Sequence, residues 1–438
     1  MHQKNEAWLV FGVQNISHKV IGTTFDYRAA KGKGNESLIT WLSRNLKPSI
    51  NFEIKEVDHP DGRLVVFFIP PANLGPVKFL KRAWIRIGSN NKSLDEFPEK
   101  EAVIWERRMP FEDRIAKEDV SEKEVLELLN HDQYFKLVDE SPPPQNETSV
   151  IEKLSQEDFI FQRKGKLHIS NVGAMLLAYD LDNFPKLKSK AVRVITYRGI
   201  NRLTAIKDLT FNKGYAVGFS PLISYVQGQV PELETIEGTL RSATIKYPKK
   251  ALREFIANAL VHQDFSVVGS SPLVEVFDNR VEISNPGKPL IEPERFMDHP
   301  PISRNEKLSD KLRRMRICEK RGSGVDRAMV EIEVAQLPPP QLEKRDDGVK
   351  ITIYSHKELS QLTKDEQSRA CYFHSCVRYV IDQEGLTNES LCKRLGIKRQ
   401  NKAIASRIIK NTLAKKYIKP FDPENKSNRY AKYLPYWA

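Results

Sequence analysis

The 438-residue sequence lacks three features that would each define a large class of proteins. It contains no run of eighteen apolar residues, so it offers no transmembrane helix and predicts no membrane partner. Its start, MHQKNEAWLVFGV, has no basic stretch followed by an apolar one, which indicates a cytoplasmic protein rather than a secreted one. The pattern G-x-x-x-x-G-K-[S/T] occurs nowhere, which argues against a helicase motor of the P-loop type.

Cysteine is also scarce, and negative charge is outweighed by positive charge. The four cysteines show neither a disulfide framework nor a zinc spacing, so we expect reduced thiols at Cys318, Cys371, Cys376 and Cys392. Charged residues make up 29% of the chain and the net charge is +13, which suits a polyanionic partner. The length predicts two to four domains, each able to bury its own core.

The stretch Ala251 to Gly287 carries the most informative pattern. Apolar residues recur at helical spacing, so residues 250–262 are predicted to form an amphipathic helix. Glu254 and Asn258 are four residues apart and therefore share one face of this helix. A carboxylate and an amide placed in this way can hold a hydrated Mg²⁺ ion and orient a water molecule. The alternative is an ordinary solvated helix face.

Two predicted strands and a glycine-rich loop follow this helix. The strands are Leu273–Phe277 and Arg280–Ser284, and they end in Asn285-Pro286-Gly287, where the backbone can approach a ligand closely. Further along, Gly322-Ser323-Gly324 precedes a helical pattern at Val325–Ile332. The free N–H groups at the start of such a helix suit a phosphate, although a lone G-S-G is more often only a turn.

The order of these pieces resembles the GHKL ATPase fold of gyrase, heat-shock chaperone 90, mismatch-repair and histidine-kinase proteins. It is most similar to the branch named after the C-terminal part of RecG-like helicases or transcriptional regulators, on the segments REFIANALVHQDFS, DNRVEISNPG, SRN and CEKRGSGVDR. The resemblance spans roughly 245–335 and implies ATP and Mg²⁺ as ligands. It also implies Glu254 as the base for hydrolysis and Asn258 as the Mg²⁺ ligand.

The resemblance further implies nucleotide contacts at Asn258, Asn285, Gly287, Gly322 and Gly324. Asn285 stands where the GHKL pattern usually has the Asp that accepts the adenine amino group, so this acceptor is expected to be uncharged. Residues 286–322 take the place of the ATP lid. Arg304 and Arg321 in and beside this segment are the candidates for phosphate contacts, with ordinary surface ion pairs as the alternative.

Residues 1–110 resemble the AlbA-like domain that is shared with Schlafen proteins. The matching segments are LVFGVQN, HKVIGTTF, PVKF and AWIRIGS, in the expected order. We predict strands at Ala7–Val13, Arg63–Pro70 and Ala83–Ile87 and a helix within 35–45. The family normally opens with a helix and an acidic segment before the strand at Ala7, so we expect part of the domain to be missing. Basic residues could form a nucleic-acid patch or a solvated edge, namely Lys78, Lys81, Arg82 and Arg86.

The end of the chain is basic and helical. Residues 364–438 contain 16 Lys and Arg against 7 Asp and Glu. Three helices are predicted, at Tyr372–Asp382, from Thr387 onward and at Lys402–Lys416, followed by strands at Tyr417–Pro420 and Tyr430–Leu434. Three helices and a wing are typical of a winged helix-turn-helix that reads double-stranded DNA. The expected DNA contacts are Lys393, Arg394, Lys402, Arg407 and Lys410.

The sequence therefore predicts an α+β multidomain protein. Its parts are an AlbA-like domain (1–110), a supporting α/β region (111–245), a GHKL-like α/β sandwich (246–355) and a C-terminal winged helix (364–438). The expected function is an ATP-binding, DNA-binding regulator, with transcription regulation as one role. The alternative is an ATP-controlled enzyme, nuclease or helicase-like, that processes nucleic acid through the AlbA-like domain. A homo-oligomer is compatible with either function.

Overall fold

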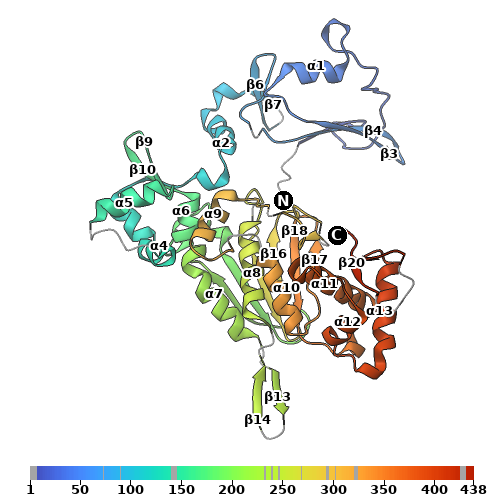
Figure 1. Ribbon diagram of the computed structural model, residues 1–438. Coiled ribbons are helices and arrows are strands. Elements are labelled where there is room, and N and C mark those ends of the chain that lie inside the picture. The colour runs from blue at the N-terminus through green and yellow to red at the C-terminus, as the bar shows by residue number, and fades with distance from the viewer. Residues whose placement is uncertain are drawn as a thin grey trace. The chain divides into compact units, whose positions relative to one another are not determined.

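The chain divides between Arg114 and Ile115 into two units, each of which mixes helices and sheets (Figure 1). This computed structural model describes residues 7–72, 74–88, 90–139, 146–230, 233–237, 240–244, 247–267, 269–292, 295–300, 302–319, 324–424 and 431–438. The predicted α+β multidomain class is confirmed by this organisation. Among the described residues, no helix is both long and apolar enough to cross a bilayer.

Two antiparallel sheets build the first unit. One has the order β1 (Ala7–Phe11), β4 (Gly62–Ile69), β3 (Glu53–His59), and the apolar run in β4 buries Val65, Val66 and Phe67. The second sheet has the order β2 (Leu46–Lys47), β5 (Lys78–Phe79), β6 (Arg82–Ile87), β7 (Asn90–Ser93). Helix α1 (Leu38–Asn45) starts at Ser37, whose side chain accepts a hydrogen bond from the Thr40 N–H. Helix α2 (Pro98–Arg108) follows the second sheet.

A small antiparallel sheet opens the second unit, in the order β8 (Ile115–Val120), β10 (Lys166–Ser170), β9 (Ile160–Arg163). The helices of this part are α3 (Glu122–Leu128), α4 (His131–Val138), α5 (Glu147–Gln156) and α6 (Asn171–Leu177). A capping box is present at the start of α3, where Ser121 and Glu124 exchange hydrogen bonds. The buried carboxylate of Glu157, just after α5, accepts from Lys311 (2.7 Å) and Arg314 (2.5 Å) and thereby fastens α9 (Glu306–Arg314) to this part.

A six-stranded sheet forms the centre of the second unit. Its order is β12 (Ala205–Phe211), β11 (Val192–Tyr197), β15 (Leu273–Phe277), β16 (Arg280–Pro286), β18 (Gly348–Tyr354), β17 (Gln341–Lys344). Only the pairing of β11 with β15 is parallel in this sheet. Three helices accompany this sheet, namely α7 (Tyr215–Gln229), α8 (Lys249–Val261) and α10 (Gly324–Val334). Helix α8 packs against β16 and lies beside α10 (Figure 1). The hairpin β13 (Leu233–Glu237) and β14 (Leu240–Thr244) lies between α7 and α8 in the chain.

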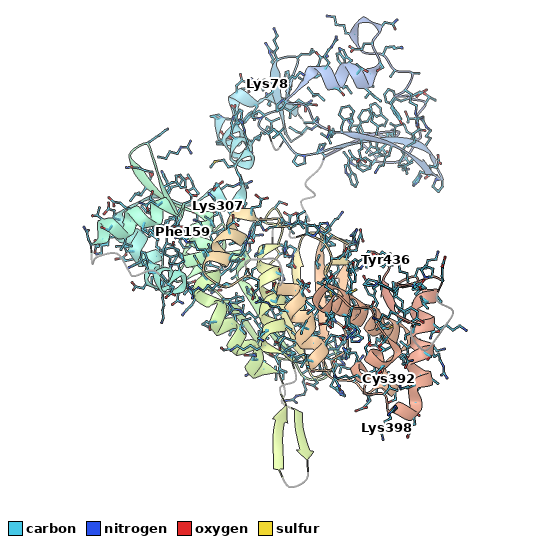
Figure 2. The ribbon with its side chains drawn as sticks, viewed as in Figure 1. Lys78, Phe159, Lys307, Cys392, Lys398 and Tyr436 are labelled. Atoms are coloured by element: carbon cyan, nitrogen blue, oxygen red, sulfur yellow. The ribbon has the colours of Figure 1, made fainter. Side chains whose placement is uncertain are left out.

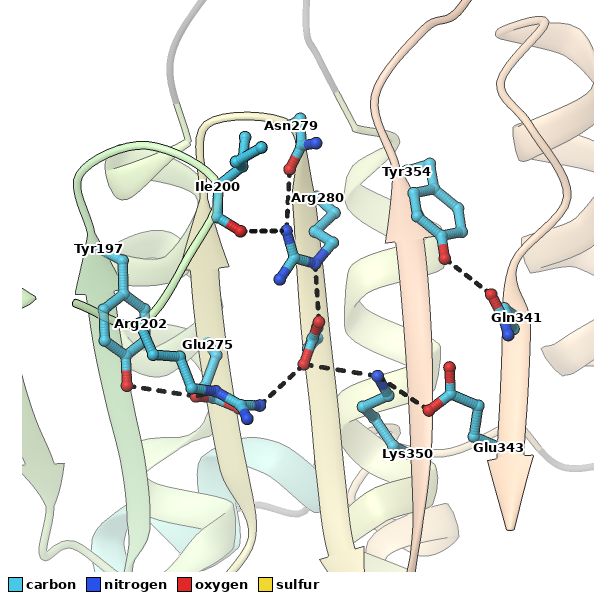
Figure 3. A network of polar contacts seen from close by, with 11 residues as sticks. Tyr197, Ile200, Arg202, Glu275, Asn279, Arg280, Gln341, Glu343, Lys350 and Tyr354 are labelled. Atoms are coloured by element: carbon cyan, nitrogen blue, oxygen red, sulfur yellow. Dashed lines mark hydrogen bonds and ion pairs between the residues drawn. The ribbon is translucent and has the colours of Figure 1, made fainter. Parts of the chain in front are cut away.

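One face of this sheet is crossed by a ladder of alternating charges (Figure 3). Glu275 and Glu282 are register partners on β15 and β16, so two like charges lie opposite each other. Both side chains are buried. Arg202 bridges them, at 2.7 Å from Glu275 and 3.0 Å from Glu282, and Arg280 adds a contact of 2.7 Å to Glu282. Burial alone would raise the pKa of Glu282, but the hydrogen bond from Arg280 and the charges of Lys350 and the arginines outweigh it and lower the pKa.

Three helices and a two-stranded sheet end the chain. They are α11 (Lys364–Asp382), α12 (Asn388–Arg394), α13 (Lys402–Ala414), β19 (Ile418–Pro420) and β20 (Tyr433–Pro435). Helix α11 starts eight residues before the predicted Tyr372, at a capping box formed by Thr363 and Glu366. The four cysteines are free thiols, and Cys371 and Cys376 lie on the buried face of α11.

Candidate nucleotide site

A cavity of about 700 Å³ lies between α8, the end of β16, the start of α10 and the segment that precedes α9. Its volume is in the range of small-molecule sites, and its wall combines apolar side chains with polar and charged ones. The predicted site residues in its wall are Glu254, Asn258, Asn285, Gly287 and Gly324. The fold thus brings together residues that are up to 70 positions apart in the chain.

Glu254 and Asn258 line this cavity from α8. The helix predicted over residues 250–262 is α8, and the amide Nδ2 of Asn258 donates to Oε1 of Glu254 at 3.0 Å. Burial raises the pKa of Glu254, the hydrogen bond from Asn258 opposes this, and the charge of Glu319 adds to the rise. A carboxylate with a raised pKa is well matched to accepting a proton near neutral pH. The amide oxygen of Asn258 is left to act as a ligand, because the amide nitrogen is used by Glu254.

Gly324 is the first residue of α10 and touches the Glu254 carboxylate. A Cβ atom added at Gly324 would overlap both carboxylate oxygens. The sequence predicts Gly324 as a nucleotide contact, and the structure adds that this glycine makes room for the Glu254 carboxylate. The positive end of the α10 dipole also faces this carboxylate, which favours its charged form.

The end of β16 and the turn after it form another part of the wall. Nδ2 of Asn285 donates to the Pro286 carbonyl at 3.2 Å, so Oδ1 is the amide atom that remains for a ligand. Gly287 has φ = +106°, and a Cβ there would approach the Asp264 Cβ to 2.8 Å. The glycine is therefore required by the turn itself. Its N–H donates to the Asp347 carbonyl at 2.9 Å, which ties this turn to the β17–β18 connection.

Arg304, predicted to contact phosphate, donates hydrogen bonds to backbone carbonyl groups in the structure. Its Nε donates to the His262 carbonyl at 3.1 Å and its Nη2 to the Lys288 carbonyl at 2.6 Å. These bonds join the end of α8 to the loop after β16. Burial, together with the charge of Arg304, lowers the pKa of His262 to about 4, so this imidazole is neutral at neutral pH. The other predicted residues of this group, Arg321 and Gly322, lie outside the described residues.

Two cations that sequence reasoning did not single out are in the cavity wall. Arg313 lies near the end of α9, where it also pairs with Asp310 at 2.5 Å, and Lys288 is exposed on the loop after β16. The sequence predicts one long lid over residues 286–322, whereas the structure places α9 within this range. The signal for α9 was the pair Leu308 and Leu312, four residues apart and fully buried, within an otherwise charged segment.

The predicted DNA contacts divide into two groups. Lys393, Lys402, Arg407 and Lys410 are exposed on α12 and α13, as is Lys398 between them (Figure 2). Arg394 is buried, however, and its Nε lies 2.7 Å from the Glu333 carboxylate of α10. Its guanidinium also donates to the Leu337 carbonyl at 2.5 Å. Arg394 thus fastens α12 to α10 and does not reach a phosphate.

Comparisons with known proteins give two family matches. The model described as "Putative ATP-dependent DNA helicase recG C-terminal" matches residues 269–353, which start after Glu254 and Asn258. The model described as "Schlafen, AlbA_2" matches residues 3–95. No curated protein matches the chain. The chain is similar to the solved structure of the DIP2311 protein from Corynebacterium diphtheriae, with 17% sequence identity and a TM-score of 0.45. The match covers 92% of this chain and 78% of the DIP2311 chain. The chain thus joins a segment that matches the Schlafen AlbA_2 family to one that matches the RecG-like C-terminal ATPase family.

Proposed function

We propose that the protein is an ATP-binding, DNA-binding regulator in which the cavity beside α8 controls a DNA-reading C-terminal part. The observation that supports this most is the Glu254–Asn258 pair, held against the start of α10 in a cavity of about 700 Å³. The two matched families are consistent with an ATP-binding protein that is associated with nucleic acid.

The residues present fit ATP with Mg²⁺. Asn258 would supply one oxygen ligand to Mg²⁺, and phosphates and water commonly supply the rest, so a large protein cage is not needed. The ion would neutralise charge on the phosphates. Glu254 would take the proton of the attacking water at a carboxylate oxygen. Asn285 would accept from the adenine amino group through Oδ1, and Arg313 and Lys288 would face the phosphates.

The C-terminal helices are proposed to read double-stranded DNA as a winged helix. Helix α13 would enter the major groove, as the last helix of such a motif does, with β19 and β20 as the wing. Lys402, Arg407 and Lys410 are exposed on α13, and Lys393 is exposed on α12. The concentration of 16 basic against 7 acidic residues in 364–438 supports this part as the main DNA site.

A second candidate function is supported by the first unit. On β6, exposed residues alternate with half-buried ones, which places Arg82, Trp84 and Arg86 on one face. Trp84 is 50% exposed and borders a shallow hollow that is also lined by Phe79. A large exposed aromatic ring between two arginines suits a nucleic-acid strand. This surface supports the alternative of an ATP-controlled nucleic-acid-processing enzyme. Among described residues, no group of three His, Cys, Asp or Glu could hold a metal ion.

Binding and hydrolysis of Mg-ATP test the proposed function directly. We expect calorimetry to show one ATP site per chain that requires Mg²⁺, and slow release of phosphate. The Asn258→Ala variant should bind ATP more weakly because the Mg²⁺ ligand is lost. A parent protein that binds no adenine nucleotide would reject the proposal. A protein that binds duplex DNA only through residues 1–114 would favour the second candidate.

The rate of ATP hydrolysis is expected to fall at mildly acidic pH. Only the carboxylate form of Glu254 can accept a proton, and burial raises its pKa above the ordinary value of 4.5. The acidic limb of the rate profile should therefore lie above pH 4.5, with full activity only above the raised pKa. Single-turnover rates from about pH 4 to pH 9 measure this limb. A rate that stays constant as the pH falls to 4.5 would contradict the role of Glu254.

Replacing Gly324 with alanine is expected to slow hydrolysis by about a hundredfold, because the new Cβ must displace the Glu254 carboxylate. The same substitution in a Glu254→Gln background should add little, since both changes act on one group. Gly228→Ala is the matched control, because a Cβ at Gly228 in α7 meets no atom within 4 Å. Equal single-turnover rates for Gly324→Ala and Gly228→Ala would show that the contact with Glu254 is not used.

A further inference from the structure

Helix α10 ends at a buried ion cluster that joins it to the C-terminal helices. Near its end, the Glu333 carboxylate lies 2.7 Å from Nδ1 of His374 on α11 and 2.7 Å from Nε of Arg394 on α12. The three side chains are only 10%, 11% and 4% exposed. Burial alone would raise the pKa of Glu333, but the hydrogen bond from His374 and the charge of Arg394 outweigh it and lower the pKa. Glu333 is therefore ionised and holds both helices.

The other end of the same helix is part of the nucleotide cavity. Gly324 lines the cavity and touches the Glu254 carboxylate, nine residues before Glu333. An α-helix rises 1.5 Å per residue, so about 14 Å of regular helix separates the two contacts. A regular helix of this length moves as a rod, because its backbone hydrogen bonds keep both ends in register. A shift at Gly324 therefore moves Glu333.

A second contact joins the cavity wall to the same C-terminal helix. Phe296 lines the cavity, and its ring packs against the ring of Phe373 on α11 with centroids 5.4 Å apart. Phe373 is the neighbour of His374 in the chain. The turn that carries Phe296 is closed by Arg295, whose guanidinium donates to the nearly buried Asp298 carboxylate at 2.6 Å. Two of the cavity's walls, α10 and the 295–298 turn, thus contact one segment of α11.

We infer that α11 transmits the state of the nucleotide cavity to the DNA-reading helices, through the Glu333–His374–Arg394 cluster and the Phe296–Phe373 contact. This inference rests on the proposed function, since it names how the nucleotide site would act on DNA binding. Helix α11 packs on α13, which carries the proposed DNA contacts, and Arg394 belongs to α12. A ligand that moves α10 or the 295–298 turn therefore changes the support of both helices at once.

The inference requires a reciprocal coupling. If nucleotide changes the affinity for DNA by a certain factor, DNA must change the affinity for nucleotide by the same factor, typically about 5- to 150-fold. The inference implies two arrangements of α11, one favoured by nucleotide and one by its absence. The coupling factor cannot exceed the ratio of the nucleotide affinities of these two arrangements. If the cluster only holds the C-terminal part in place, altering the cluster would leave this coupling factor unchanged.

The test compares Glu333→Gln and Phe373→Leu with the matched control Glu331→Gln. Glu331 is also an ion-paired carboxylate of α10, but its partner is Lys250 of α8 at 2.5 Å, on the side away from α11. Fluorescence anisotropy with a labelled duplex, with and without a non-hydrolysable ATP analogue, gives the coupling factor for each protein. We expect the factor to fall toward one in Glu333→Gln and in Phe373→Leu, and to stay at the parent value in Glu331→Gln. Parent-like factors in both test variants would overturn the inference.

A measurement without any ligand separates this inference from the proposed function. In Glu333→Gln, hydrogen exchange should become faster in α10 and in residues 295–300 together, because the support from α11 is weakened. Phe373→Leu, which keeps the core apolar, should show the same pattern to a smaller extent. Faster exchange confined to α11 and α12 would overturn the coupling even if the parent binds ATP. If the parent binds no nucleotide, the proposed function fails, whereas the exchange pattern still decides whether α11 links the two sites.

Discussion

Replacing Glu254 with glutamine is expected to slow ATP hydrolysis by about a hundred- to ten-thousand-fold while ATP binding stays nearly unchanged. Glutamine has the shape of glutamate and can still pair with the Asn258 amide, but it cannot accept a proton from water. The Asn258 ligand and the cavity wall remain in place, so affinity is preserved. Single-turnover hydrolysis and calorimetric binding, measured on the same preparation, separate the two effects.

Loss of folding is not expected to explain this result. Burial raises the pKa of Glu254, so its charged form is disfavoured in the folded state. Stability from this group is therefore lost as the pH rises through the raised pKa, and a neutral glutamine avoids that loss at neutral pH. The variant should melt at or above the temperature of the parent. Glu331→Gln, on the neighbouring helix, controls for loss of a carboxylate, and its rate should equal that of the parent.

Two outcomes would contradict this assignment. If Glu254→Gln hydrolyses ATP as fast as the parent, another group accepts the proton and Glu254 is only a binding or structural residue. If the variant loses affinity together with rate, the carboxylate acts in binding, for instance by orienting Asn258. A parent that binds ATP without hydrolysing it would leave the site as a nucleotide sensor, with Glu254 still available to hold a water molecule.

The periodic parts of the fold could be predicted from the sequence, whereas the partners of individual charges could not. The spacing of Leu252, Phe255, Ile256 and Ala259 predicts α8 to within one residue at each end. The predicted strands Leu273–Phe277 and Arg280–Ser284 likewise correspond to β15 and to the first part of β16. Helical and strand periods are local properties, so a single sequence contains them.

The roles of Arg304, Arg394 and Gly324 depend on segments that are distant in the chain. Arg394 lies among other basic residues in a basic helix, and nothing near it in the sequence shows that Glu333, 61 positions earlier, will neutralise it. The sequence predicts Gly324 as part of a phosphate-binding loop, and only the structure shows that Glu254 fills the space beside it. The type of residue thus predicted the kind of chemistry, and tertiary contacts decided where it is used.

These contacts also change how DNA binding must be tested. Removing residues 364–438 would delete His374 and Arg394 and leave the Glu333 carboxylate without its two partners. A carboxylate that loses its buried partners is strongly destabilising. The same deletion would uncover Phe296 in the cavity wall. A truncated chain could therefore lose ATP binding for structural reasons, so surface substitutions on α13 and beside it are the sharper experiment.

Replacing Lys398, Lys402, Arg407 and Lys410 together with alanine is expected to weaken duplex binding on the order of a thousand-fold in 0.1 M salt. All four side chains are exposed, so their loss should not disturb the core. Each phosphate contact releases condensed counterions, which contributes just under tenfold at this salt concentration. A parent that neutralises about six phosphates should show a log–log salt slope near −5, and the variant a slope near −2. Titrations of labelled duplex at several salt concentrations measure both quantities.

The matched control removes four exposed lysines from other elements of the same unit, Lys123, Lys188, Lys207 and Lys344. It changes the net charge equally, so a general electrostatic effect would weaken both proteins alike. Arg407→Ala alone should change the sequence preference if Arg407 meets a base edge, and only flatten the slope by about one if it meets a phosphate. If the fourfold variant binds duplex as tightly as the control, the C-terminal helices serve protein interaction or dimerisation instead. The face of β6 with Arg82, Trp84 and Arg86 would then be the stronger nucleic-acid site.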